Sequence, residues 1–305
     1  MACSVRSGVS DLYVCGWRLR TGLTLPAALP WPEPGRGAPD VTFSAGSVPA
    51  SLKNPVLDLE VLQIGSRGTA LVRFNGIGRF LIHKRRVLTA LEIRRDAPEL
   101  TAVIFGNVTA AICWRREQLA LHGSAAAIGG KAVLLLGRAD TGKSLLAAAL
   151  ALRGHSALSD EVAAVSRKHC FPAGSALCLA DDALGALGID RRGLPQSRRW
   201  RTPKRLWHGG PAPEPRPYPI AAVVCLKKGE SGSRHRMRRL KDEAAIEAIL
   251  DQVFRRGMLP ILDSARAAKR EARALAGAVP VVEFTIARDL SCIGTAADAI
   301  ERLVR

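Results

Sequence analysis

One eight-residue segment constrains this chain more than any other. Residues 137–144 read GRADTGKS and match the pattern G-x-x-x-x-G-K-[S/T], in which the glycines let the backbone wrap closely around phosphate oxygens. An apolar run, AVLLL, comes directly before this segment, and a run of helix formers, LLAAALAL, comes directly after it. The sequence therefore predicts a strand, a phosphate-binding loop and a helix in that order, which favours an α/β fold.

The residues of this loop have separate expected tasks. We expect backbone N–H groups to face phosphate oxygens and the following helix to add its positive dipole end. Lys143 would reach the β- and γ-phosphates of a nucleotide, and the Ser144 hydroxyl would ligate Mg²⁺. The expected nucleotide-contacting residues here are Gly137, Arg138, Ala139, Asp140, Thr141, Gly142, Lys143, Ser144 and Leu145.

Asp160 and Glu161 are the next candidates, because they lie about one helix and one turn beyond the loop, in the strand-like run SALSDEVAAV. Mg²⁺ takes oxygen ligands from carboxylates and phosphates, and an acceptor hydroxyl needs a base to take its proton. Neighbouring residues of a strand point to opposite sides, so only one carboxylate would face the phosphate unless the strand ends there. Taken alone, His122 reads as a satisfied core histidine at a strand start.

Residues 1–115 read as a β-rich N-terminal domain. Asn75-Gly76 lies between two β-prone runs and predicts a hairpin, and the period-two alternation from Asp40 predicts a strand. The mostly apolar segment 98–121 predicts a helix that leads into a second domain, which we place at 116–305.

The second domain alternates strands and helices, which is typical of an α/β fold. Two apolar runs joined at Gly129-Gly130 predict a hairpin that ends beneath the loop. The Arg- and Pro-rich residues 191–219 predict a surface loop, and residues 233–241 a solvated basic turn. We expect strands at 220–228 and 279–287, and helices at 242–254, 263–278 and 294–305.

Composition bounds the compartment and the partners. The formal net charge of +18 predicts attraction to an acidic partner. Seven cysteines without C-x-x-C spacing argue against a zinc site or a disulfide framework, and they favour a reducing compartment, so we expect a cytoplasmic protein. The N-terminus lacks the apolar core of a signal peptide and no apolar run is long enough to span a bilayer, so we expect no membrane partner.

Residues 121–165 resemble the catalytic domain of the HPr kinase/phosphorylase family. Within that family the segment is most similar to the HPr-kinase-like serine kinases of bacterial peptide-biosynthesis clusters, lasso-peptide precursor kinases included. The shared order is His-Gly, a hairpin, the phosphate loop, a helix, Arg-Gly-His and an acidic pair. The matching residues are His122-Gly123, Gly137 to Ser144, Arg153-Gly154-His155 and Asp160-Glu161.

The resemblance implies a P-loop kinase domain of the HPr kinase/PEP carboxykinase type, with ATP and Mg²⁺ as cofactors. It implies that Asp160 is the base, that Glu161 helps Asp160 and Ser144 to hold the metal, and that His122 lies near the phosphate and the acid pair. The chain departs from the family in having Asp-Glu in place of Asp-Asp, and Ala139-Asp140-Thr141 in place of the usual Ser-Gly. The family signature for binding HPr is not recognisable after residue 165, so HPr is not the implied acceptor.

The basic stretches have two readings. Lys204 and Arg205 precede the strand run PYPIAAVV, as similar basic residues do in the resembling kinases, so we favour them as contacts to the γ-phosphate or to an acidic peptide. Arg198, Arg199 and Arg201 belong to a solvated loop or to the same contact. Loop charges of this kind are more often simply solvated.

We therefore expect a kinase acting on a Ser or Thr hydroxyl of a peptide or small protein, and the resemblance implies a ribosomal peptide precursor, of the lasso type, as that acceptor. Two rivals stay open. One is a small-molecule kinase, for example of free serine, and the other is a nucleotide-binding regulatory module that contacts nucleic acid. Only 5% of residues are aromatic and no helix-turn-helix is visible, so nucleic acid is the weaker expectation. Homo-oligomerisation stays open.

Overall fold

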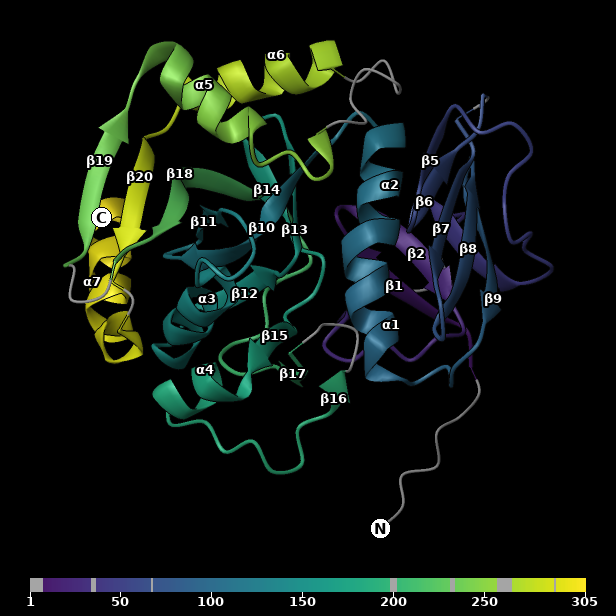
Figure 1. Ribbon diagram of the computed structural model, residues 1–305, viewed down its shortest axis with the longest axis horizontal. Helices are drawn as coiled ribbons and strands as arrows, with labels where there is room; N and C mark the ends of the chain where they lie inside the picture. Colours follow the sequence, from purple (N-terminus) through teal and green to yellow (C-terminus); the bar gives the residue numbers. More distant parts are fainter. Residues whose placement is uncertain are drawn as a thin grey trace.

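The computed structural model describes residues 8–33, 37–66, 68–197, 202–230, 234–256, 265–287 and 289–305. These residues form a mixed α/β protein (Figure 1). A large β-sheet built from residues 10–91 lies on one side of a helical segment, and a second sheet with its own helices lies on the other.

The first sheet has the strand order β3-β1-β2-β4-β9-β8-β7-β6-β5, with β4 parallel to β2 and β9 and the other neighbours antiparallel. Its hairpin at Asn75-Gly76 joins β7 to β8, as the sequence predicts, and Val41–Ala45 is the strand expected from Asp40 onward. The strands are β1 (Ser10–Val14), β2 (Trp17–Thr21), β3 (Leu29–Pro30), β4 (Val41–Ala45), β5 (Leu57–Leu59), β6 (Leu62–Ile64), β7 (Ala70–Phe74), β8 (Gly78–His83) and β9 (Arg86–Leu91).

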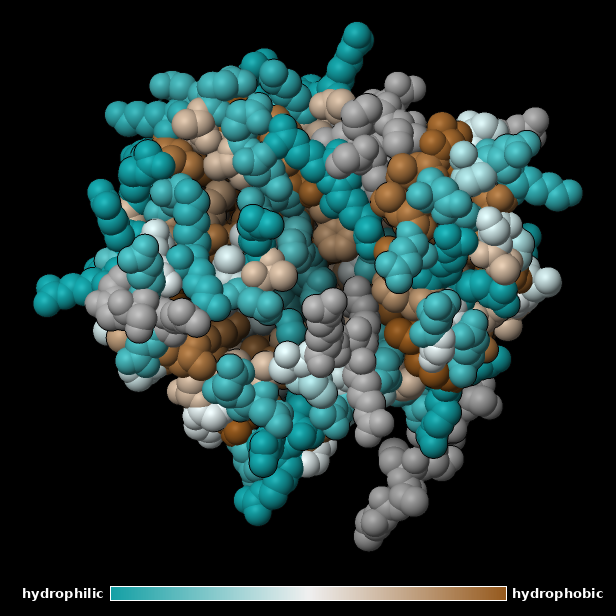
Figure 2. Space-filling model, viewed as in Figure 1, coloured by the Kyte–Doolittle hydropathy of each residue, from teal (hydrophilic) through white to brown (hydrophobic). Residues whose placement is uncertain are grey.

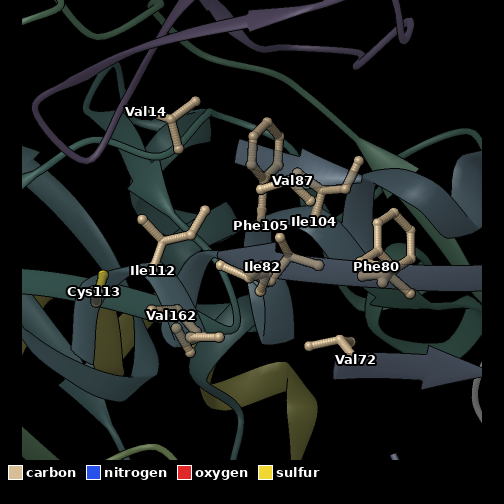
Figure 3. Packing of buried hydrophobic residues seen from close by; sticks show 14 of the residues in the cluster. Val14, Val72, Phe80, Ile82, Val87, Ile104, Phe105, Ile112, Cys113 and Val162 are labelled. Carbon is tan, nitrogen blue, oxygen red and sulfur yellow. The ribbon is translucent and has the colours of Figure 1, made fainter. Parts of the chain in front are cut away.

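The expected helix at 98–121 is present but ends earlier, because Leu119 already begins a strand. It consists of α1 (Pro98–Val103), a π-helical turn (Ile104–Val108) and α2 (Thr109–Arg115). Figure 3 shows Ile104, Phe105 and Ile112 of this segment packed with sheet residues such as Phe80 and with Val162. One hydrophobic core contains residues from both sides of position 115. The division into two domains at 115/116 stays a prediction.

The second sheet has the order β11-β10-β13-β14-β18-β20-β19, and β11 also pairs with β18. The predicted hairpin at Gly129-Gly130 joins β10 to β11. The strands are β10 (Leu119–Ile128), β11 (Lys131–Leu136), β12 (Ser156–Ser159), β13 (Val162–Ser166), β14 (His169–Phe171), β18 (Tyr218–Lys228), β19 (Arg236–Leu240) and β20 (Val281–Ile286).

Helices cover both faces of this sheet, as their apolar stripes require. On one face α3 (Lys143–Leu152) and α7 (Ile293–Val304) pack against Leu135, Val224 and Phe284. On the other face α5 (Asp242–Leu250) and α6 (Ala265–Ala276) pack against Leu134 and Val223. Alternate residues of β11 and β18 therefore point into different cores.

Two expectations about basic segments are wrong. Residues 191–219 are not all loop, because β17 (Lys204–Trp207) pairs with β15 (Leu177–Ala180) and β16 (Gln196–Ser197), burying Leu206 and Trp207. Residues 236–240 are not a turn but the edge strand β19, which pairs with β20 and sets Arg238 against Glu283. The short helix α4 (Asp181–Ala186) follows β15.

Within the described residues, no helix combines the length and the apolar character that a membrane crossing requires. Five of the six described cysteines are buried, and the sixth, Cys292, is half-buried.

Candidate functional site

The segment 137–144 joins β11 to α3, which is the strand–loop–helix order expected from the sequence. Gly137 has φ +154°, and a Cβ there would lie 2.8 Å from both the Leu226 carbonyl oxygen and Thr141 Oγ. Gly142 has φ +92° and is the N-cap of α3, where its carbonyl accepts from Leu146 N. Both glycines are therefore required by the path of the backbone into the helix.

Lys143 begins α3 and is only 8% exposed. Its Nζ donates to the Arg138 carbonyl oxygen at 2.7 Å, and Thr141 Oγ donates to the same oxygen at 2.9 Å. Burial lowers the pKa of the Lys143 ammonium, and the nearby Asp160 and Glu161 carboxylates oppose this shift. The loop thus holds a desolvated positive charge at the N-terminus of a helix, which suits a bound anion.

The other loop residues differ in what they offer. Leu145 is buried in the core against α7 and β11, so only its backbone can face a ligand. Arg138, Ala139 and Asp140 are exposed, and Asp140 has φ +59°. Asn and Asp tolerate this left-handed conformation better than most residues, which fits the sequence at this position.

The acid pair lies at an interruption of one long ladder. β12 pairs with β10 from Ser156 to Ser159, and β13 continues the antiparallel register from Val162 opposite His122. Asp160 and Glu161 lie between the two strands, with Glu161 at φ +69° and its carbonyl accepting from Gly123 N. This left-handed backbone interrupts the strand, so the simple alternation expected for a strand does not apply to this pair.

Asp160 is held by three hydrogen bonds and is 7% exposed. Its Oδ1 accepts from Ser124 Oγ at 2.6 Å and from Ser144 Oγ at 2.8 Å, and its Oδ2 accepts from Cys178 N at 2.9 Å. The structure therefore brings the loop hydroxyl and the first carboxylate of the pair into direct contact. Glu161 is less buried than Asp160, and its Cβ lies 3.7 Å from the position of a Cβ on Gly106, in the π-helical turn.

His122 lies at the end of the β10 segment that pairs with β13. Its backbone N donates to the Gln252 carbonyl oxygen at 2.7 Å, and its ring meets the Phe254 ring edge-on at 5.8 Å. Burial, followed by the Lys143 charge, lowers the pKa of His122 to about 4. His122 is consequently neutral at neutral pH, and it feels the charges of Lys143 and Asp160 as a site residue would.

Lys204 and Arg205 are placed differently although they are adjacent. The charge of Lys204 acts on both His122 and Lys143, so Lys204 belongs to the same cluster. Arg205 instead donates from Nε to Asp181 Oδ1 at 2.8 Å and from a terminal nitrogen to the Leu194 carbonyl. Adjacent residues of a strand point to opposite faces of the sheet, which explains why these neighbours in β17 have different surroundings. Arg198, Arg199 and Arg201 lie outside the described residues.

Sequence reasoning missed three partners in this site. Ser124 has a signal in hindsight, because it lies two residues after His122 on the same strand and so on the same side. The Cys178 N–H and the Gln252 carbonyl have none, because a backbone contact made across the fold leaves no mark on residue type. All three act by holding Asp160 or His122 in place.

The donor set fits a magnesium ion better than a metal held by protein alone. Within the described part of the chain, no group of three or more His, Cys, Asp or Glu could hold a metal ion. Mg²⁺, however, is usually held by one or two carboxylates together with substrate phosphates and water. The Asp160 carboxylate and the Ser144 hydroxyl are hard oxygen donors already in contact at the loop, so they fit that pattern.

Comparisons with known proteins give little beyond this geometry. No family model matches the sequence, and no curated protein matches it. Among solved structures, the chain is similar to the Hpr(Ser) kinase/phosphatase from Coxiella burnetii, at 15% identity and a TM-score of 0.27, over 61% of this chain and 93% of that chain. A similarity this weak cannot carry a function, which has to be argued from the residues of the site.

Proposed function

We propose that this protein is an ATP- and Mg²⁺-dependent kinase that phosphorylates a Ser or Thr hydroxyl, on a peptide or small protein. The observation that carries the proposal is the 2.8 Å contact between Ser144 Oγ and Asp160 Oδ1. It joins the hydroxyl of the phosphate loop to the first carboxylate of the acid pair, at the N-terminus of α3. A carboxylate at this point can help to hold the Mg²⁺ of a bound nucleotide, and it can also take the proton of an acceptor hydroxyl.

The transfer would proceed in line. The acceptor oxygen attacks the γ-phosphorus while its proton passes to a carboxylate, and the bond from the γ-phosphorus to the bridging oxygen breaks to release ADP. Loop N–H groups and the Lys143 ammonium would stabilise charge on the phosphoryl oxygens. To do so, Lys143 Nζ must exchange the Arg138 carbonyl for a phosphate oxygen. Mg²⁺, held by Ser144 and Asp160, with Glu161 as a further arm, would neutralise phosphate charge.

Asp160 is our candidate base, and His122 supports it. The carboxylate is fixed by Ser124, Ser144 and Cys178, so its orientation toward an incoming hydroxyl would be set before binding. The neutral His122 ring can accept a hydrogen bond from the acceptor without adding charge beside Lys143. Lys204 would add positive charge on the side of the transferred phosphoryl group.

Charge supports a peptide as the acceptor. The chain carries a net charge of +18, and hydrophilic side chains dominate the face seen in Figure 2. An acidic segment next to the acceptor hydroxyl would be attracted to such a surface, whereas free serine has no net charge to exploit. A lasso-type precursor peptide is the candidate that the sequence resemblance suggests.

Mass spectrometry tests the proposal directly. The protein is incubated with ATP, Mg²⁺ and either peptides encoded beside its gene, free serine or an oligonucleotide. A mass increment of one phosphate on one peptide supports a peptide kinase, and equal phosphorylation of free serine favours a small-molecule kinase. Oligonucleotide binding without any phosphoryl transfer would point instead to a regulatory module.

A further inference from the structure

A large pocket adjoins the first half of the phosphate loop. Its volume is about 800 Å³, and its walls are loop residues 138–141, the end of β18 at 225–228, the end of α5 and the facing parts of β19 and β20. Two of the elements that line it, α5 and the connection from β11 to α3, can be followed in Figure 1. Small-molecule sites commonly have volumes of about 300–1,000 Å³, so the space suits a ligand of nucleoside size.

The pocket touches the loop but not the transfer machinery. None of Lys143, Ser144, His122 or Asp160 lines it. A nucleotide whose γ-phosphate lies at Asp160 must extend its other end away from that carboxylate. The pocket is lined by loop residues 138–141 and by none of the transfer residues, so it offers a place for the nucleoside half.

Asp140 gives the pocket its chemistry. Its charge acts on Lys143, but its carboxylate makes no hydrogen bond or salt bridge with a described residue. The pocket's other acids form salt bridges: Glu283 with Lys227 and Arg238, and Asp251 with Arg256. A carboxylate inside a phosphate loop weakens phosphate binding if it faces the phosphates. Turned into the pocket, the same carboxylate accepts hydrogen bonds from ribose hydroxyls, and Leu240 and Ala248 offer apolar contact to a base.

We infer that this pocket is the nucleoside site and that Asp140 is its ribose-binding residue. The inference rests on the proposed function, since it takes the loop to be a triphosphate site. It gives a purpose to the one loop residue that phosphate binding alone leaves unexplained, and it assigns ATP recognition to two separable parts, the loop for phosphates and the pocket for the nucleoside.

Calorimetric titration of ATP and of inorganic tripolyphosphate, both with Mg²⁺, separates those parts. Asp140→Asn keeps a residue that tolerates positive φ but weakens the acceptor. We expect ATP affinity to fall about tenfold, the loss of one charge-assisted hydrogen bond, while tripolyphosphate affinity stays unchanged or rises. If Asp140→Asn instead tightens both ligands, the carboxylate faces the phosphates and the inference is wrong.

A pocket-filling variant tests the volume independently. Ala248→Leu should lower ATP affinity by at least about tenfold without changing tripolyphosphate affinity, and Ala244→Leu, the same change at an exposed position one turn earlier on α5, should change neither. An unchanged ratio of the two affinities in Ala248→Leu, in a variant with the wild-type melting temperature, overturns the nucleoside site. A wild-type protein that binds neither ligand refutes the proposed function itself, which is a different result.

Discussion

Ser144 and Asp160 are sixteen positions apart and are joined by a 2.8 Å hydrogen bond from Ser144 Oγ to Asp160 Oδ1. The bond links the start of α3 to the two residues between β12 and β13, so the loop and the acid pair form one unit. Ser124 donates to the same oxygen from β10 at 2.6 Å. β10 and α3, together with β15 through Cys178 N, therefore hold a single carboxylate in position.

Asp160→Asn should separate binding from chemistry. If Asp160 takes the acceptor proton, the variant should bind ATP with nearly wild-type affinity and lose phosphoryl transfer by about 10²-fold or more. Calorimetry with ATP and Mg²⁺ measures the first quantity, and single-turnover transfer to the acceptor measures the second. Asp182→Asn, at an exposed position at the start of α4, is the matched control and should change neither.

Two other outcomes would reassign Asp160. Transfer at the wild-type rate would make the carboxylate structural, with its hydrogen bonds to Ser124 and Cys178 as its task. A collapse of ATP binding that depends on Mg²⁺ would make it mainly a metal ligand, and the less buried Glu161 would become the better candidate base.

Lys143→Ala should weaken ATP binding by at least about tenfold, because it removes a desolvated charge that faces the phosphates. Lys131→Ala is the matched control, since Lys131 is exposed at the start of β11, at the other end of the strand from the loop. Isothermal titration of both variants gives the comparison. Equal ATP affinity in a folded Lys143→Ala protein would show that the loop is not a phosphate site.

Burial of neutral His122 predicts a loss of stability in mild acid. Its pKa is about 4 in the folded protein against about 6.5 in the unfolded chain, so the unfolded chain binds the proton first as pH falls. The contribution of neutral His122 to the free energy of unfolding is present above pH 6.5 and is lost as the pH falls from 6.5 to 4. The loss amounts to about 2 kcal/mol by pH 5. Urea unfolding at a series of pH values measures this loss.

His122→Gln supplies the reference for that measurement, because glutamine is polar but does not titrate. The difference in unfolding free energy between wild type and His122→Gln should change between pH 7 and pH 5 in the direction that weakens the wild type. A difference that stays constant with pH would mean that His122 does not become charged on unfolding in this range.

Lys204 and Arg205 should differ in their effect on ATP. Lys204 acts on His122 and Lys143, so Lys204→Ala should weaken ATP binding or slow transfer. Arg205 is engaged by Asp181 and the Leu194 carbonyl, so Arg205→Ala should mainly lower the melting temperature and leave ATP affinity nearly unchanged. Calorimetry and thermal unfolding measure these effects. If Arg205→Ala weakened ATP binding and Lys204→Ala did not, the expectation that Arg205 contacts the nucleotide would hold after all.

Local sequence patterns predict much of this fold. The loop, its flanking strand and helix and the hairpins at Asn75-Gly76 and Gly129-Gly130 all follow from residue type at fixed spacing. The break in the strand at Asp160-Glu161 does not, because it is defined by the separate pairing of β12 and β13 along β10. Pairing between distant segments decides it.

The strands β17 and β19 were missed for a different reason. Both are rich in Arg and Lys, a composition that usually indicates solvated loops. β17 is held by the burial of Leu206 and Trp207, and β19 by its ladder with β20 and the Arg238–Glu283 contact. These contacts are made with distant segments, so the Arg- and Lys-rich composition of the two strands does not indicate them.

The final prediction concerns the acceptor peptide. If the basic segment between β16 and β17 holds an acidic peptide, neutralising Arg198, Arg199 and Arg201 together should raise the KM for peptide and leave the KM for ATP unchanged. The matched control removes three exposed arginines elsewhere, Arg234, Arg236 and Arg239 at β19, and so has the same net charge.

Salt should act on the acceptor in the same way as the first triple variant. Exposed charges are screened within about 10 Å at 0.1 M ionic strength, so raising salt toward physiological levels should raise the peptide KM of the wild type. This rise of the peptide KM with salt should be smaller in the triple variant at 198–201 and undiminished in the β19 control. Only the variant at 198–201 would have lost the arginines that contact the peptide. If the two triple variants behave alike, the attraction comes from the net charge of the whole protein, and the segment between β16 and β17 is not a peptide site.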